Sequence, residues 1–212
     1  MRFAAILVPL GVSLAVAGGI MYYASIKPAE AATPVPEIRH PVSRAMLLDA
    51  ATFSEKVAPY FRLQDAHGID VQIGGVGKKP QFVYFILDGC PCSLDAQPLF
   101  NKMYQRYKDK VDFIGVIDKP KPNAIDYAGM TTMLCPIVSD PDLKIVKAFK
   151  ARESTYNVLI RPDGTIEKMW PGYCQNTMAE LNRRLAKLTG EKEVAFDASL
   201  APKEMKSGCF FY

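Results

Sequence analysis

A short apolar strand followed by two cysteines constrains the fold of this chain more than any other feature. Residues 81–88 read QFVYFILD, which is too short for a helix and rich in residues typical of a strand buried on both faces. The turn signal Asp88-Gly89 comes next, and about 15 residues of helical pattern follow it. Cys90 therefore lies where a buried strand meets a helix N-terminus, with Cys92 in the first helical turn.

This position changes the chemistry of a cysteine. Unpaired backbone N–H groups and the positive end of the helix dipole favour a thiolate, so we expect a depressed pKa and a nucleophilic role for Cys90. Pro91 suits the first turn because its missing N–H costs nothing there. Cys92 has three open roles: a resolving thiol, an inert residue on the helix, or a partner of Cys90 in a strained, easily reduced disulfide.

Composition restricts the classes of function. The chain has 212 residues, is 49% hydrophobic, and spreads its net charge of +4 along the sequence, which gives one domain with appendages and no nucleic-acid-binding patch. Its five cysteines are too few and too irregular for a disulfide scaffold. Neither His40 nor His67 is near a cysteine in sequence, so we expect no resident metal and no cofactor. Copper(I) held by Cys90 and Cys92 is the metal alternative.

The N-terminus predicts a membrane segment. Residues 3–26 carry no charge and are long enough to span a bilayer. A cleaved signal peptide is the competing interpretation, because residues 29–31 read Ala-Glu-Ala, a small-x-small site. We favour an uncleaved single-pass anchor within residues 1–27, a proline-rich linker over residues 28–45, and a domain on the extracytoplasmic (periplasmic) side of the cell membrane.

Strands and helices alternate along the rest of the chain. The pattern predicts helices at residues 45–55, 90–108, 122–134 and 143–149, hairpins over 58–71 and 157–170, strands at 111–117 and 137–138, and a last helix opened by a capping box at 177–180 and ended at Gly190. This order indicates an α/β sandwich with a central mixed sheet flanked by helices, spanning residues 46–190. Residues 191–212 lack periodicity and are expected to form a loose tail.

Several motifs occur in a fixed order within this domain. They are APxFxLxDxxG at residues 58–68, Lys79-Pro80 before the strand, Cys90-Pro91, SDPD at 139–142 and LIxPDGxI at 159–166. Over roughly residues 54–189 the chain resembles the peroxiredoxin-like branch of the thioredoxin fold (alkyl hydroperoxide reductase/thiol-specific antioxidant, or redoxin). The resemblance implies a thioredoxin-like fold and a thiol-dependent antioxidant enzyme, with Cys90 at the position of the family's nucleophile.

The site departs from both groups that share this fold. Leu87 and Val83 stand where peroxiredoxins carry a threonine and a proline, and Arg152 is the candidate for their peroxide-orienting arginine. The second cysteine of a Cys-x-x-Cys pair would fall at Ser93, so Cys92 comes one residue early. Residues 154–156 read Ser-Thr-Tyr where thioredoxin-type reductases place a cis-proline.

The remaining cysteines have separate expectations. If the hairpin over residues 157–170 starts at the active-site end, its return places Cys174 near Cys90, which makes Cys174 a second candidate for the resolving thiol. Cys135 follows a helix that should run away from that end, so we expect a structural role. Cys209 resembles, by placement alone, the C-terminal resolving cysteine of some dimeric peroxiredoxins.

We therefore expect a membrane-tethered thiol oxidoreductase whose Cys90 attacks a peroxide or a protein disulfide, with Cys92 or Cys174 resolving the intermediate. Its expected partners are that substrate, a thiol reductant protein and, through residues 3–26, the membrane, with no nucleic acid. A peroxiredoxin-like antioxidant is the first interpretation and a thioredoxin-like thiol-disulfide reductase is the alternative. A non-catalytic binding module or copper(I) carrier is the third.

Overall fold

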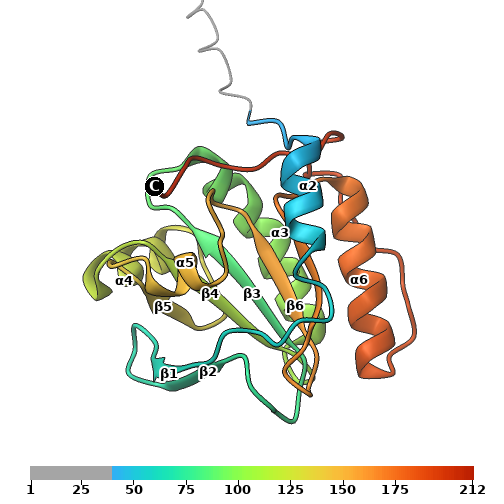
Figure 1. Ribbon diagram of the computed structural model, residues 1–212, viewed down its shortest axis with the longest axis horizontal. Helices are drawn as coiled ribbons and strands as arrows, with labels where there is room; N and C mark the ends of the chain where they lie inside the picture. The colour runs from blue at the N-terminus through green and yellow to red at the C-terminus, as the bar shows by residue number, and fades with distance from the viewer. Residues whose placement is uncertain (1–39) are drawn as a thin grey trace, which may run out of the picture. The chain divides into compact units, whose positions relative to one another are not determined.

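The computed structural model describes residues 40–212 (Figure 1). The predicted anchor at residues 3–26, and the cleavage site that would make it a signal peptide, lie outside the described residues. Within residues 40–212, none of the helices combines the length and the apolar character that crossing a membrane requires.

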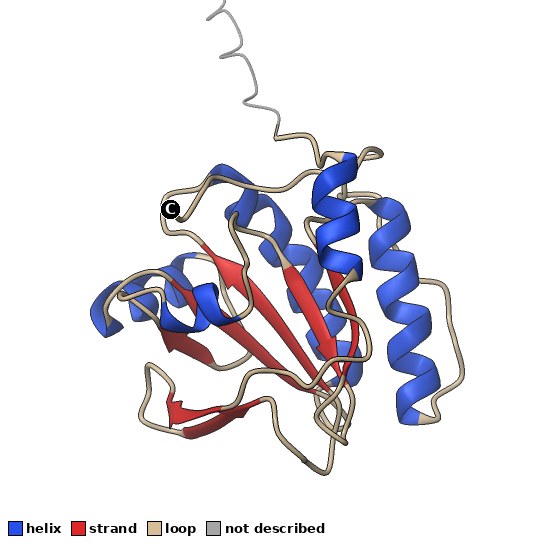
Figure 2. Ribbon diagram, in the orientation of Figure 1, coloured by secondary structure: helices blue, strands red, loops and turns tan. Residues whose placement is uncertain are grey.

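The centre of the domain is a five-stranded mixed sheet in the order β5-β4-β3-β6-β7 (Figure 2). Strands β3 (Gln81–Ile86), β4 (Asp112–Ile117) and β5 (Ile137–Ser139) run parallel, whereas β6 (Asn157–Ile160) is antiparallel to β3 and β7 (Ile166–Trp170) is antiparallel to β6. All six residues of β3 are buried, because this strand lies in the middle of the sheet and is covered on both faces. The predicted mixed sheet is confirmed.

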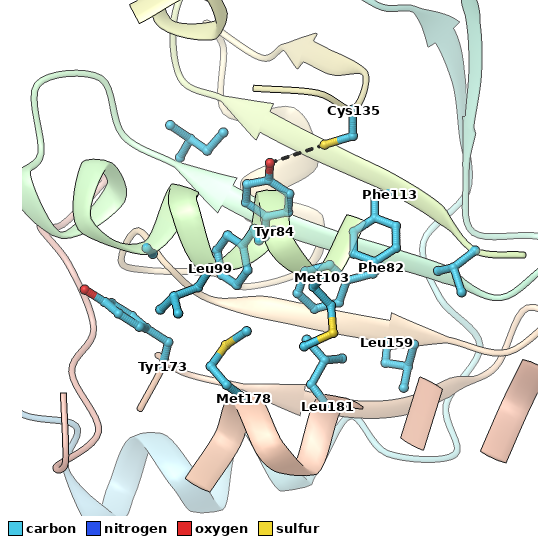
Figure 3. Packing of buried hydrophobic residues seen from close by; sticks show 14 of the residues in the cluster. Phe82, Tyr84, Leu99, Met103, Phe113, Cys135, Leu159, Tyr173, Met178 and Leu181 are labelled. Atoms are coloured by element: carbon cyan, nitrogen blue, oxygen red, sulfur yellow. Dashed lines mark hydrogen bonds between the residues drawn. The ribbon is translucent and has the colours of Figure 1, made fainter. Parts of the chain in front are cut away.

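Successive residues of β3 point to opposite faces and build two hydrophobic cores. Phe82 and Tyr84 pack with α3 (Pro91–Tyr107), α4 (Lys121–Met130) and α6 (Gln175–Thr189) on one face (Figure 3). Val83 and Phe85 pack on the other with residues of α2 (Arg44–Ala51), α5 (Lys144–Ala148) and the hairpin of β1 (Phe61–Gln64) and β2 (Asp70–Ile73). Helices thus cover both faces of the sheet, as a thioredoxin-like sandwich requires.

The last helix begins earlier than the capping pattern predicts. Its N-cap is Cys174, and Thr177, expected to be the cap, lies at the third helical position, where its hydroxyl accepts a 2.7 Å hydrogen bond from the Cys174 backbone N–H. Glu180 instead accepts hydrogen bonds from Lys168 and Trp170 of β7. The motif was right about a helix start but was placed three residues too late, because the partner of Glu180 is the sheet rather than the helix end.

The C-terminal tail contains no helix or strand in the part of the chain that the structure describes, but it is packed and not loose. The Tyr173 N–H donates to the Lys206 carbonyl at 2.9 Å, the Ser207 N–H donates to the His40 carbonyl at 2.9 Å, and Ser207 is fully buried. Figure 1 shows the tail, in red, crossing the end of the sheet where β3 leads into α3. The expectation of a loose tail is therefore wrong.

Candidate active site

Cys90 is held at the N-terminus of α3 by a tight turn. Its backbone N–H donates to the Leu87 carbonyl at 3.1 Å, and Gly89 has the left-handed φ of 77° that the turn requires. Cys90 is the N-cap residue and Pro91 is the first helical residue. The Asp88 N–H donates to the Asp118 carboxylate at 2.8 Å, which ties the turn to the end of β4. These positions are the ones that the sequence predicts.

The sulfur of Cys90 is surrounded by hydrogen-bond donors. The Ser154 hydroxyl lies 3.2 Å from it and the Cys209 backbone N–H donor lies 3.3 Å from it. The pKa of Cys90 is held far below its ordinary value, chiefly by a hydrogen bond from the Cys92 thiol, against the opposing effect of burial, and with further help from Ser154 and Cys209. The depressed pKa agrees with the sequence prediction, although side-chain donors contribute more to it than the helix end.

Cys92 supports the charge on Cys90 by staying protonated. Its hydrogen bond to the neighbouring Cys90 sulfur, reinforced by burial, raises the pKa of Cys92 well above its ordinary value. The two thiols therefore divide the roles: Cys90 carries the negative charge and Cys92 donates to it.

Ser154 belongs to a strained loop that leads into β6. The next residue, Thr155, has φ of 64°, which is uncommon for a β-branched side chain, and its buried hydroxyl has no hydrogen-bond partner among the described residues. The loop is held in place because the Thr155 N–H donates to the Phe85 carbonyl of β3 at 2.8 Å. Strain of this kind costs about 1–3 kcal/mol, and it occurs one residue after Ser154, whose hydroxyl is hydrogen-bonded to Cys90.

The predicted return of the chain by β7 is confirmed, and it leads to Cys174 at the start of α6. Trp170 pairs with Asn157 at the active-site end of the sheet, as the topology argument requires. Cys174 then caps α6, is only 4% exposed, and receives a 3.6 Å hydrogen bond from the Thr177 hydroxyl. Among residues 40–212, no hydrogen bond joins the sulfurs of Cys174 and Cys90.

Cys135 lies in the core next to Tyr84, as Figure 3 shows. Its sulfur and the Tyr84 hydroxyl are 3.3 Å apart, and burial raises the pKa of Cys135 to about 11. A protonated, buried thiol of this kind fits the structural role expected from the sequence.

The position of Cys209, in the C-terminal tail, is the one that the sequence predicted least well. Cys209 lies against Cys90, and its own sulfur is 3.8 Å from Nε2 of His40. Burial and the contact with Cys90 raise the pKa of Cys209. His67, in contrast, is exposed in the turn of the β1–β2 hairpin. Three contacts build this part of the site: Ser154 with Cys90, Cys209 with Cys90, and Cys209 with His40. Each joins segments that are far apart in the sequence, so no local sequence pattern could have predicted it.

Two other expectations concern groups near the site. Arg152 is exposed, and its carbonyl accepts a 2.9 Å hydrogen bond from the Phe211 N–H. Within residues 40–212, no set of three or more His, Cys, Asp or Glu side chains is arranged to hold a metal ion.

The sequence is similar to that of a named thiol-disulfide oxidoreductase, and the fold is similar to those of several solved structures. The chain is 27% identical over 122 residues to the thiol-disulfide oxidoreductase ResA of Halalkalibacterium halodurans, which covers 57% of this chain and 69% of the relative. A proposed protein disulfide isomerase from Bacteroides thetaiotaomicron superposes with a TM-score of 0.60 at 23% identity, covering 65% of this chain and 91% of that one. A proposed thiol:disulfide interchange protein DsbE from Chlorobium tepidum gives a TM-score of 0.59 at 17% identity, over 65% and 98% of the two chains.

The structural neighbours share the thioredoxin-like fold, and the named relatives are consistent with a thiol oxidoreductase. A family model gives the assignment itself. The AhpC/TSA family model matches residues 55–169, which is more than half of the chain and includes both Cys90 and Ser154. The chain therefore belongs to the AhpC/TSA family.

Proposed function

We propose that this protein is a thiol-disulfide oxidoreductase in which Cys90 is the nucleophile. The observation that carries the proposal is the set of donors around the Cys90 sulfur, from Ser154, Cys92 and the Cys209 N–H, which stabilise a thiolate. A thiolate is the species that attacks a disulfide. The name of the Halalkalibacterium halodurans relative, a thiol-disulfide oxidoreductase, supports the same chemistry.

The surroundings of Cys90 favour a disulfide over a peroxide as substrate. Leu87, at the position of the peroxiredoxin threonine, contributes no hydroxyl, and Arg152, the candidate for the arginine, is exposed with its backbone paired to the tail. The one side-chain hydroxyl at the Cys90 sulfur, among the described residues, is that of Ser154. We therefore prefer the reductase over the peroxiredoxin-like antioxidant, and the test below separates them.

The reaction needs two steps and a second thiol. The Cys90 thiolate attacks one sulfur of the substrate disulfide, which forms a mixed disulfide and releases the other sulfur as a thiolate. A second protein thiol then attacks Cys90, and the substrate leaves fully reduced. Cys92 and Cys209 both contact Cys90, whereas Cys174 caps α6. A thiol reductant protein would return the enzyme to its dithiol form.

The test compares two oxidants on the reduced protein. One sample receives hydrogen peroxide and the other a peptide mixed disulfide, and the state of Cys90 is followed by rapid quenching and mass spectrometry. We expect fast mixed-disulfide formation at Cys90 and slow formation of sulfenic acid. A Cys135→Ser variant should behave as the wild type, and Cys90→Ser should show neither reaction.

Other outcomes identify the other interpretations. Rapid sulfenic acid at Cys90 with slow disulfide exchange would establish a peroxidase. If Cys90 reacts with neither oxidant, the protein is a non-catalytic binding module. If such an unreactive protein bound one copper(I) per reduced chain, it would be a carrier, with Cys90 and Cys92 as ligands.

For localisation, we propose an extracytoplasmic domain tethered to the cell membrane through residues 3–26. The support is the uncharged run of that segment and the proline-rich stretch after it. Protease added to cells with a permeabilised outer layer should digest residues 46–212. Full protection would reverse the orientation, and a mature N-terminus at Ala32 would replace the anchor by a signal peptide.

A further inference from the structure

Residues 205–211, called the strap below, are held at their upstream part by three other segments of the chain, at residues 40–42, Tyr173 and Glu153. The Val42 N–H donates to the Met205 carbonyl at 3.1 Å, and Ser207 donates through its N–H to His40 at 2.9 Å. Lys206 exchanges backbone hydrogen bonds with Tyr173 at 2.9 and 3.1 Å. The Ser207 hydroxyl also donates to the buried carboxylate of Glu153.

The downstream part of the strap runs antiparallel to residues 152–154 and forms an isolated β-bridge with them, between Glu153 and Phe210. The Gly208 N–H donates to the Ser154 carbonyl at 3.0 Å, and the Ser154 N–H donates to the Cys209 carbonyl at 2.9 Å. The Phe211 N–H donates to the Arg152 carbonyl at 2.9 Å. An edge that accepts its own chain in this way is also suited to an extended segment of another protein, since the contacts are made by backbone groups.

Gly208 lets the strap approach the site closely. A Cβ atom on Gly208 would lie 1.9 Å from the Ser154 hydroxyl oxygen and 3.1 Å from the Cys90 sulfur. Any side chain there would push the strap away from both residues. As a result of this approach Cys90 is only 1% exposed, and the strap covers the sulfur that the substrate must reach.

Cys209 sits between the nucleophile and a base. Its backbone N–H donor is 3.3 Å from the Cys90 sulfur, and burial together with the nearby Cys90 raises the pKa of its thiol. On its other side the Cys209 sulfur lies 3.8 Å from Nε2 of His40, which is within hydrogen-bonding reach of a sulfur atom. A neutral imidazole in this position can take the proton of the thiol.

We propose that Cys209 is the resolving thiol of Cys90, that His40 accepts its proton, and that the strap occupies the edge on which an extended substrate segment pairs. This inference rests on the proposed function and names the second thiol of that reaction. It assigns the resolving step to a residue of the same chain, on a segment that has to leave the edge before the substrate can bind.

The step balances as follows. When Cys90 carries the substrate as a mixed disulfide, His40 takes the proton of Cys209, and the Cys209 sulfur attacks the Cys90 sulfur. The Cys90–Cys209 bond forms, the bond to the substrate sulfur breaks, and the substrate leaves as a thiolate that is protonated from solvent. Two electrons pass from the protein dithiol to the substrate disulfide, and an external thiol reductant later restores Cys90 and Cys209.

Cys92 is less suited to this step. It lies only two residues from Cys90, in the first turn of α3, so a disulfide between them would close a very small ring. The Ser93 and Leu94 N–H groups both donate to the Cys90 carbonyl, at 3.1 and 3.3 Å, so a bond to Cys92 would strain that turn. To bring Cys209 to Cys90, the strap needs only to pair again with residues 152–154. Because this edge can pair with one segment at a time, the return of the strap also displaces the substrate.

The experiment follows the two steps separately with a short peptide whose cysteine forms a mixed disulfide with thionitrobenzoate. Release of the coloured thionitrobenzoate reports attack by Cys90, and release of the reduced peptide reports resolution. We expect the wild type to release both and to end with a Cys90–Cys209 disulfide, mapped by mass spectrometry. Cys209→Ser should give a full first step and accumulate the peptide on Cys90, with resolution slowed at least ~10-fold, because a tethered thiol acts at roughly millimolar effective concentration.

Three further variants test the mechanism and not just the thiol. Gly208→Val keeps Cys209 but blocks docking, so its second step should be slow as well. His40→Gln should slow only the second step and should be rescued by added imidazole. Cys174→Ser is the matched control and should behave as the wild type.

The two proposals fail in different ways. If thionitrobenzoate release does not depend on Cys90, the proposed function is wrong. If the first step is normal and Cys209→Ser releases the peptide at the wild-type rate, leaving a Cys90–Cys92 disulfide, the proposed function stands and the inference about the strap is overturned. A full first step in Cys209→Ser also shows that this variant is folded.

Discussion

The hydrogen bond from Ser154 to Cys90 makes a quantitative prediction. In Ser154→Ala the hydroxyl 3.2 Å from the Cys90 sulfur is lost, while Cys92 and the Cys209 N–H remain. A hydrogen bond to a charged group contributes about 1.5–3 kcal/mol. Since one pKa unit corresponds to about 1.4 kcal/mol, we expect the pKa of Cys90 to rise by ~1–2 units.

The pKa of Cys90 can be measured from the pH dependence of its alkylation by iodoacetamide, which reacts with the thiolate. The midpoint for Cys90, followed by mass spectrometry, should move to higher pH in Ser154→Ala and stay in place in Ser199→Ala, which removes an exposed hydroxyl. A midpoint in Ser154→Ala equal to that of the wild type would refute the account of the thiolate given above.

The same shift has a consequence for stability, with a definite sign. The pKa of Cys90 is lower in the folded protein than in the unfolded chain, so its thiolate stabilises the fold above the unfolded pKa, and this contribution is lost as the pH falls through the folded pKa. Ser154→Ala should therefore lower the free energy of unfolding more at pH 9 than under acidic conditions. Urea titrations at the two pH values measure the difference.

Two predictions concern stability elsewhere. Thr132 is exposed with φ of 47°, so Thr132→Gly should raise the free energy of unfolding by ~0.5–1 kcal/mol in urea titrations, whereas Thr131→Gly, at a position with φ of −96°, should lower it. Burial opposes ionisation of Glu180, but hydrogen bonds from Lys168, Trp170 and Arg184 lower its pKa to about 2. Glu180→Gln should therefore cost about 2 kcal/mol of unfolding free energy at pH 7, and this cost should fall away as the pH drops from the unfolded carboxyl pKa toward 2; an equal cost at both ends of the range would contradict the assignment.

Local patterns predicted the part of the site that is made locally. The apolar run before Asp88-Gly89 identified β3, and the position of Cys90 at a helix start followed from the next few residues. The element order and the solvent-exposed turn at His67 were also predictable, because each depends on residues close together in the sequence, and the alternation of strands and helices indicated the mixed sheet.

The pairing of segments far apart in the chain could not be predicted from the sequence. Residues 152–154 and the strap are separated by more than fifty positions, and their contact uses backbone groups that any residues could supply. The topology argument for Cys174 placed the end of β7 correctly, but it could not show that the side chain would turn toward Thr177 as a helix cap. Cys209 stands in a segment without periodicity, so nothing near it indicated a neighbour.

The burial of β3 has a consequence for the motions of the two sulfurs. Cys90 directly follows β3, whose six residues are all buried and which is hydrogen-bonded to β4 on one side and β6 on the other. The amide protons of β3 should therefore exchange with solvent only when the whole domain unfolds. Within residues 40–212, the backbone of strap residues 208–211 pairs only with the short segment 152–154 and with the Cys90 sulfur, and Phe210 is 66% exposed, so their amide protons should exchange through small local openings. Hydrogen exchange would thus find a fixed nucleophile facing a partner that detaches and returns many times within the lifetime of the folded state.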